Sequence, residues 1–63
     1  MQNDKLFGAQ LKLKRKKLNL TQKQMAKIFG ISSGHYAQIE RSEKSPGFYL
    51  FLKMDKWLDS HSN

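Results

Sequence analysis

The sequence predicts an all-α fold, a compact bundle of four or five short helices. Apolar residues recur at spacings of three and four along most of the 63 residues, and no segment shows the clean alternation of a half-buried strand. Turn-forming residues separate these segments at short intervals. The whole chain, residues 1–63, is expected to form a single domain.

The first helix is expected over residues 6–18. Phe7, Leu11 and Leu18 lie close to one stripe of this helix and are its predicted buried face. Leu13 is off that stripe, so we expect it at an edge or an interface.

The second helix is expected over residues 22–29. Thr21 suits its N-cap, with Gln24 three residues later as the partner in a capping box. Gly30 provides a residue that ends a helix in the left-handed conformation at little cost. The predicted buried face is Met25, Ile28 and Phe29.

The third helix is expected over residues 33–41, capped by Ser32 or Ser33 and buried through Tyr36 and Ile39. Two helices this short, joined by a tight turn, suit a steep crossing. This arrangement is typical of a helix-turn-helix.

The fourth helix is expected to begin at about Pro46 or Gly47 and to cover residues 47–58. Pro46 suits a first helical turn, where the missing amide donor costs nothing. The segment before it, residues 42–47, reads as a loop. The polar tail, residues 59–63, is expected to be flexible.

The formal net charge is +7, and its distribution is uneven. No Asp or Glu occurs between Lys5 and Ile39, whereas eight lysines and arginines do. A field of one sign favours an anionic partner, and nucleic acid fits best because phosphate neutralisation supplies most sequence-independent affinity. The alternative is a solvated basic face that serves only solubility.

Composition excludes several classes of protein. There is no cysteine, and His35 and His61 lie far apart, so we expect no metal and no cofactor. The longest apolar run, residues 48–52, is far too short to span a membrane, and the first residues lack the apolar core of a secretory signal. Few acids, two separated histidines and short helices argue against an enzyme.

Together these patterns resemble the lambda repressor/Cro-like helix-turn-helix family, most of all a small phage Cro-type regulator. The resemblance covers about residues 6–58. It is carried by Gly8, Leu11, Arg15, Leu20-Thr21-Gln22, Met25-Ala26, Phe29-Gly30-Ile31-Ser32, Ile39-Glu40-Arg41, Pro46 and Leu52-Lys53-Met54.

The resemblance implies a sequence-specific transcriptional regulator of the Cro or repressor type, from a bacteriophage, a plasmid or another mobile element, that blocks or recruits polymerase. Its third helix is expected to enter the major groove of a pseudo-palindromic operator. The resemblance also implies a cytoplasmic location in a bacterial cell, on the nucleoid when bound. The positions it assigns to DNA binding are Thr21, Gln22, Ser32, Ser33, Gly34, His35, Gln38, Arg41 and Lys44.

These positions differ in their expected roles. Gln22 resembles the phosphate-contacting glutamine of the family. Gln38 is the best candidate for base readout, because its amide can contact adenine N6 and N7 together. Ser33 offers a less specific contact with a base. His35 is expected either to contact a phosphate or the groove wall, or to be a surface histidine without a function. Arg41 and Lys44 are expected to contact the backbone and not the bases.

The resemblance also implies an ion pair between Arg15 and Glu40, which we expect to be partly buried. Four positions depart from the family pattern. Gly34 lies inside the recognition helix, Ser42 replaces a glycine after it, and Asp55 and Trp57 stand where alanine is usual. Most members also have a fifth helix that builds the dimer interface, and few residues follow the fourth helix here to form one.

The fourth helix is unusually rich in aromatic residues, and one small core cannot accept them all. We therefore expect a homodimer, at least on DNA, or a docking surface for another protein. The predicted surface consists of Phe48, Tyr49, Phe51 and Trp57. The alternative function is a DNA-binding antitoxin whose C-terminal helix docks a partner. The alternative for Tyr49 and Trp57 is that they cap the edge of the core.

Overall fold

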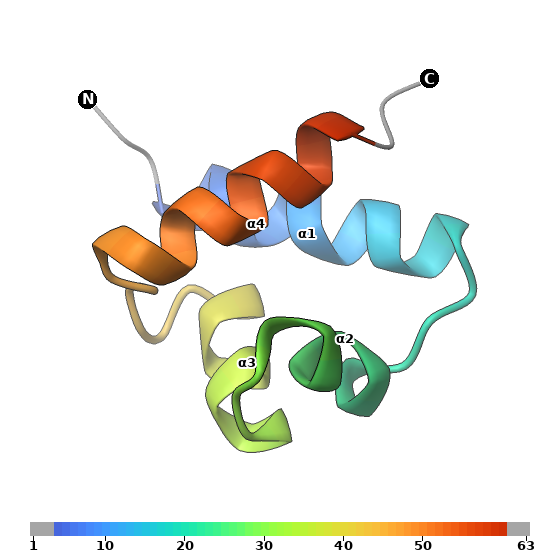
Figure 1. Cartoon of the computed structure of the whole chain (residues 1–63), viewed down its shortest axis with the longest axis horizontal. Coiled ribbons are helices and arrows are strands. Elements are labelled where there is room, and N and C mark those ends of the chain that lie inside the picture. The colour runs from blue at the N-terminus through green and yellow to red at the C-terminus, as the bar shows by residue number, and fades with distance from the viewer. Residues whose placement is uncertain (1–3, 61–63) are drawn as a thin grey trace.

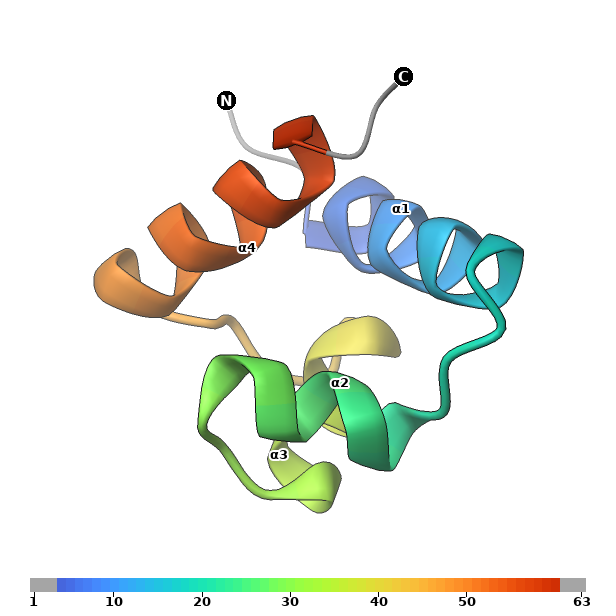
Figure 2. The ribbon, with the colours of Figure 1, turned by 45° about the vertical axis from the view of Figure 1, so that its right-hand side comes forward.

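A computed structural model of the chain describes residues 4–60. They form four helices and no strand, which confirms the predicted all-α class. The helices are α1 (Asp4–Lys17), α2 (Gln22–Phe29), α3 (Ser33–Glu40) and α4 (Phe48–Ser60). In Figures 1 and 2, α1 and α4 form one side of the molecule and α2 and α3 form the other. None of the described helices is long and apolar enough to cross a membrane.

The helix boundaries follow the predictions closely for α2 and less closely elsewhere. The observed α2 has the predicted bounds, while α3 ends one residue early and α1 is shifted toward the N-terminus. The prediction for α4 was wrong at both ends. Gly47 has a φ of +83°, which places it outside the helix, and its carbonyl accepts the Phe51 N–H at 2.9 Å. Pro46 therefore precedes the helix and does not form its first turn.

Part of the predicted flexible tail, residues 59–63, belongs to α4. Asp59 and Ser60 continue the helix for two residues beyond Trp57 and Leu58. These two apolar residues pack in or against the core and hold the end of α4 in place. Residues 61–63 lie outside the described part of the chain.

Three of the helices, α1, α2 and α3, end in the same type of turn. After each one a residue takes the left-handed conformation, with φ of 59° at Asn19, 70° at Gly30 and 63° at Ser42. The next residue then donates its N–H to a carbonyl five residues back, which is the mark of a Schellman motif. Ser42 thus keeps the left-handed turn at the position where the family usually has glycine. These bonds are Leu20 to Arg15 at 3.0 Å, Ile31 to Ala26 at 3.0 Å and Glu43 to Gln38 at 2.8 Å.

The core lies between the two helix pairs and draws side chains from every helix. Three aromatic contacts run through it, with ring centroids 5.0 Å apart for Phe7 and Phe51, 6.1 Å for Phe29 and Trp57, and 6.4 Å for Phe29 and Tyr36. The buried members are Phe7, Leu11, Met25, Ala26, Phe29, Tyr36, Ile39, Met54 and Trp57.

Two predicted core residues are about half exposed. Leu18 is predicted on the buried stripe of α1, but the helix ends at Lys17. Leu18 therefore no longer follows the helical periodicity that would turn its side chain toward the core. Ile28 was placed on the buried face of α2, whereas α2 packs through Met25, Ala26 and Phe29. The small Ala26 is buried on the helix that packs against α3, so the contact face of α2 is rotated away from Ile28.

At Gly8 the backbone of α1 lies close to the backbone at the end of α3. A Cβ atom at this position would lie 2.6 Å from the Glu40 carbonyl oxygen and 2.7 Å from that of Ile39. Both obstacles are backbone atoms, so no side chain can move aside to make room. The absence of a side chain at Gly8 therefore sets the distance between these two helices.

We expect the Gly8→Ala variant to be destabilised by about 3 kcal/mol or more, at the upper end of the usual cost of overpacking, because backbone must shift. The measurement is urea unfolding followed by circular dichroism. Gly34→Ala is the matched control, since a Cβ atom there would meet nothing within 4 Å. Equal stability of the two variants would contradict the close approach.

Candidate nucleic-acid interface

One face of α3 is polar and exposed, while the opposite face lies in the core. Gly34 and Gln38 lie four residues apart on α3, Arg41 follows three positions later as the C-cap residue, and all three are exposed. Tyr36 and Ile39, predicted as the buried face, are buried as expected. The core thus fixes the rotation of α3 about its axis, and that rotation directs the polar stripe outward.

The start of α3 is held by Ser32, which resolves the choice between Ser32 and Ser33 as the cap. The Ser32 hydroxyl oxygen accepts the His35 N–H at 3.1 Å. Ser33 and Gly34 follow in the first turn and are exposed, while His35 is partly buried. Figures 1 and 2 show this turn at the end of α3 that points away from α1 and α4. The first turn of α3 is therefore open to a large partner.

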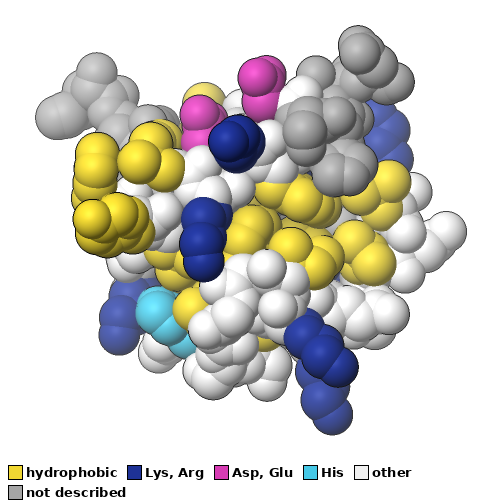
Figure 3. Space-filling model, in the orientation of Figure 1, with side chains coloured by type: hydrophobic (Ala, Val, Ile, Leu, Met, Phe, Trp, Pro, Cys, Tyr) yellow, Lys and Arg dark blue, Asp and Glu magenta, His cyan; other side chains and the backbone are white. Residues whose placement is uncertain are grey.

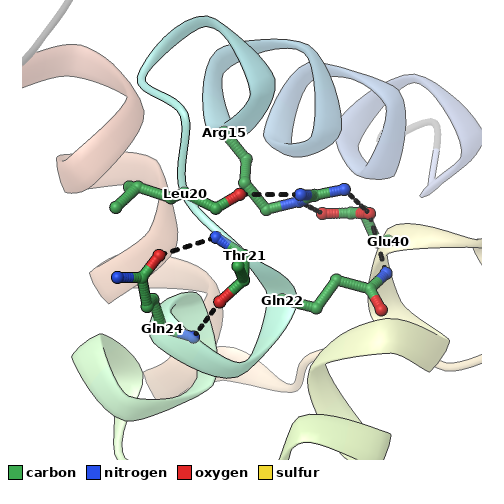
Figure 4. A network of polar contacts seen from close by, with 6 residues as sticks. All are labelled: Arg15, Leu20, Thr21, Gln22, Gln24 and Glu40. Carbon is green, nitrogen blue, oxygen red and sulfur yellow. Dashed lines mark hydrogen bonds and ion pairs between the residues drawn. The ribbon is translucent and has the colours of Figure 1, made fainter.

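The start of α2 forms the predicted capping box. The Thr21 hydroxyl oxygen accepts the Gln24 N–H at 3.1 Å, and the Gln24 side-chain oxygen accepts the Thr21 N–H at 2.8 Å (Figure 4). Gln22, the next residue, donates its side-chain amide to Glu40 Oε1 at 3.0 Å. The amide has a second hydrogen with which it could donate to a phosphate.

The predicted ion pair between Arg15 and Glu40 is present and buried. Arg15 Nε donates to Glu40 Oε2 at 2.7 Å, Nη2 donates to Oε1 at 3.1 Å, and Nη1 donates to the Leu20 carbonyl at 2.8 Å (Figure 4). The side chains are 11% and 2% exposed. The network joins α1, the turn before α2, the first residue of α2 and the last residue of α3.

Burial and hydrogen bonding act in opposite directions on the Glu40 carboxyl group. Burial raises its pKa, but hydrogen bonds, first of all from Arg15, outweigh this and hold the pKa below its usual range. The same contact raises the pKa of Arg15.

The buried Tyr36 hydroxyl makes no hydrogen bond of ordinary geometry within the described residues. Burial and the nearby Glu40 carboxylate raise the pKa of that phenol.

The two cations that follow α3 are accessible. Arg41 is paired with Glu43 through two contacts of 3.1 Å, and both side chains are more than half exposed. An ion pair in solvent is weak, so a phosphate can compete with Glu43 for the guanidinium. Lys44 is also exposed.

Lys14 has a structural role that the sequence did not reveal. Its ammonium group donates to the carbonyls of Trp57, at 3.2 Å, and Leu58, and lies 5.2 Å from the centre of the Trp57 ring. These carbonyls belong to the last turn of α4, which lacks partners within the helix. Burial lowers the pKa of Lys14, and the Asp59 carboxylate opposes this effect. The basic run of α1 contains several lysines, and no sequence signal identifies Lys14 as the one that contacts α4. Its only distinction in the sequence is that it directly precedes Arg15.

The predicted aromatic surface is divided between solvent and core. Phe48 and Tyr49 are 73% and 83% exposed, and their rings are 6.0 Å apart. Hydrophobic side chains gather where α4 begins, at the left of Figure 3. Phe51 packs partly against Phe7, and Trp57 is only 9% exposed within the core. Trp57 therefore offers little area to a partner and does not merely cap the edge of the core.

The pH dependence of stability should report on Glu40. Because its folded pKa is depressed, its contribution is present above the unfolded pKa of about 4.3 and is lost as the pH falls through the folded value. At neutral pH, Glu40→Gln should cost about 3–5 kcal/mol, since Arg15 is left buried without its charge partner. Urea unfolding between pH 2 and 7 measures both effects.

The control is the double variant Arg15→Met with Glu40→Met, which strands no charge and should recover much of the lost stability. A Glu40→Gln variant within 1 kcal/mol of the wild type would show that the pair contributes as little as an exposed one.

A helix-turn-helix family model matches residues 11–59, which include α2, the turn at Gly30 and α3. No curated protein and no solved structure matches the chain. The matched family is a DNA-binding, non-enzymatic one. The chain belongs to the lambda repressor/Cro-like helix-turn-helix family and is a regulator that binds double-stranded DNA.

Proposed function

We propose that this protein is a sequence-specific transcriptional regulator of the Cro or repressor type. The observation that carries the proposal is the exposed stripe of Gly34 and Gln38 on α3, which Arg41 continues at the C-cap, on a helix whose other face is buried. The N-terminal part of such a helix contacts base edges when it lies in the major groove. The net charge of +7 supplies the sequence-independent attraction to the phosphates.

Each residue of this interface has a distinct role in the proposal. Gln38 reads a base pair, with adenine favoured by the geometry of its amide, and Ser33 makes a less selective contact beside it. Arg41 and Lys44 contact the DNA backbone after the end of α3. Ser32 acts mainly through its cap.

Thr21, Gln22 and His35 complete the interface on the phosphate side. Thr21 places the start of α2, and Gln22 donates its second amide hydrogen to a phosphate while Glu40 holds its side chain. The positive end of the α2 dipole favours a phosphate at the same place. His35 lies in the first turn of α3, partly buried, where it reaches the groove wall.

We also propose that the protein binds its operator as a homodimer. Phe48 and Tyr49 give the described surface an exposed aromatic pair, and Leu52 extends it one turn along α4. Contact between two copies through this surface would pair two recognition helices for half-sites about 34 Å apart, one turn of the duplex. The alternative is that the same surface docks a toxin, which a neighbouring small toxin gene would favour.

The Gln38→Ala variant should lose sequence preference at one position of each half-site. The wild type would first be used to select sequences from a random duplex pool at near-physiological salt. Loss of a good base contact costs about 1–3 kcal/mol, so the dissociation constant should rise roughly 5- to 150-fold on the selected site and little on random DNA. Gln10→Ala, an exposed change on α1, is the control.

A selected pool that stays random, with binding that falls steeply with salt, would contradict specific readout. In that case the charge alone would bind DNA, and the exposed aromatic surface would be the place to look for a partner protein.

The double variant Phe48→Ser with Tyr49→Ser should weaken the dimer without unfolding the domain, because both side chains are largely exposed. Sedimentation with and without the selected operator measures the stoichiometry. Leu13→Ser removes an equally exposed apolar side chain from α1 and should leave the dimer intact. A wild type that remains one copy per palindromic operator would contradict the dimer and favour the toxin-docking alternative.

A further inference from the structure

Two glycines lie within helices, and the fold needs only one of them. Glycine destabilises a helix interior relative to alanine, so its presence calls for a reason. At Gly8 the reason is the backbone of α3, which leaves no room for a Cβ atom. At Gly34 a Cβ atom would meet nothing within 4 Å, and φ is not in the left-handed region. Neither packing nor backbone conformation therefore accounts for Gly34.

The position of Gly34 points to the DNA. It lies in the first turn of α3, four residues or about one helical turn before Gln38, so the two residues share the exposed face. This turn is the part of α3 farthest from α1 and α4 (Figures 1 and 2). When a recognition helix enters the major groove, the side chains of its first turn determine how near its backbone can come to the base edges.

We propose that Gly34 is a specificity-determining position that acts through the absence of a side chain. Because no Cβ stands on this exposed first turn of α3, a group of the size of one methyl can take its place beside the backbone. Among the groups that base pairs present in the major groove, the C5-methyl of thymine is the one of this size and apolar character. That methyl group occupies the place that a Cβ at position 34 would take, and the helix then lies deep enough for Gln38 to reach the neighbouring base pair.

This inference rests on the proposed sequence-specific binding and adds a base preference to it. It requires a thymine in each half-site, next to the base pair that Gln38 reads. It also requires that a single added methyl group on the protein be incompatible with the methyl group on the DNA, while remaining compatible with the fold.

The test combines one protein variant with one modified base. Gly34→Ala should raise the midpoint of thermal unfolding by a few degrees, because alanine is the better helix former and meets no obstacle. Its dissociation constant for the wild-type operator should rise at least tenfold, while binding to random duplex at low salt stays within twofold. Deoxyuridine replaces each thymine of the half-site in turn, and at one position it should restore most of the affinity of Gly34→Ala.

The control for altered helix stability is Gln10→Ala on α1, which should not change operator binding. A Gly34→Ala variant that binds the operator as tightly as the wild type overturns the inference, as does a loss that no deoxyuridine restores. A wild type that selects no sequence overturns the proposed function itself, and that outcome is visible before any variant is made.

Discussion

The buried contact between Arg15 and Glu40 is the constraint on which the rest of this structure depends. It joins α1 to the end of α3, and through Leu20 and Gln22 it also holds the turn before α2 and the first residue of α2. A chain of 63 residues can bury only a small core, so a contact that holds three helices at once matters more than it would in a larger protein. Two ions placed out of water are costly unless every partner is in place. The observed arrangement satisfies this network, and the same arrangement leaves the polar stripe of α3 exposed.

The remaining constraints are steric and act at the helix ends. Gly8 allows α1 to approach the carbonyls of Ile39 and Glu40 closely, which brings Arg15, two turns later, over the Glu40 carboxylate. The three left-handed turns at Asn19, Gly30 and Ser42 then direct each helix into the next. Only one of these residues is glycine, and the serine at position 42 keeps a conformation that usually costs an L-residue energy.

Local chemistry made the helix-turn-helix predictable, and long-range packing limited the rest. The capping box, the left-handed Gly30 and the bounds of α2 depend on residues within one turn of each other, so the sequence was sufficient. Leu18, Ile28 and Trp57 were misplaced because burial depends on where a helix ends and on what packs against it. The predicted start of α4 is wrong because Gly47 has a positive φ of 83°, which is outside the helical region. The ion pair was expected from the family resemblance, but its link to Gln22 needed the fold. The roles of individual residues toward DNA are still predictions.

The position of Lys14 has a consequence for how many cations this protein can offer to a polyanion. Its ammonium group is committed to the last carbonyls of α4 and to the Trp57 ring, and Arg15 is committed to Glu40. Two of the twelve positive side chains are thus internal to the fold, although they lie in the most basic run of the chain. Each phosphate that a cation neutralises on duplex DNA releases roughly 0.9 of a condensed counterion. The number of salt ions displaced on binding therefore counts only the cations that contact phosphate. Because Lys14 and Arg15 are engaged within the fold, we expect this number to be smaller than the twelve lysines and arginines would suggest.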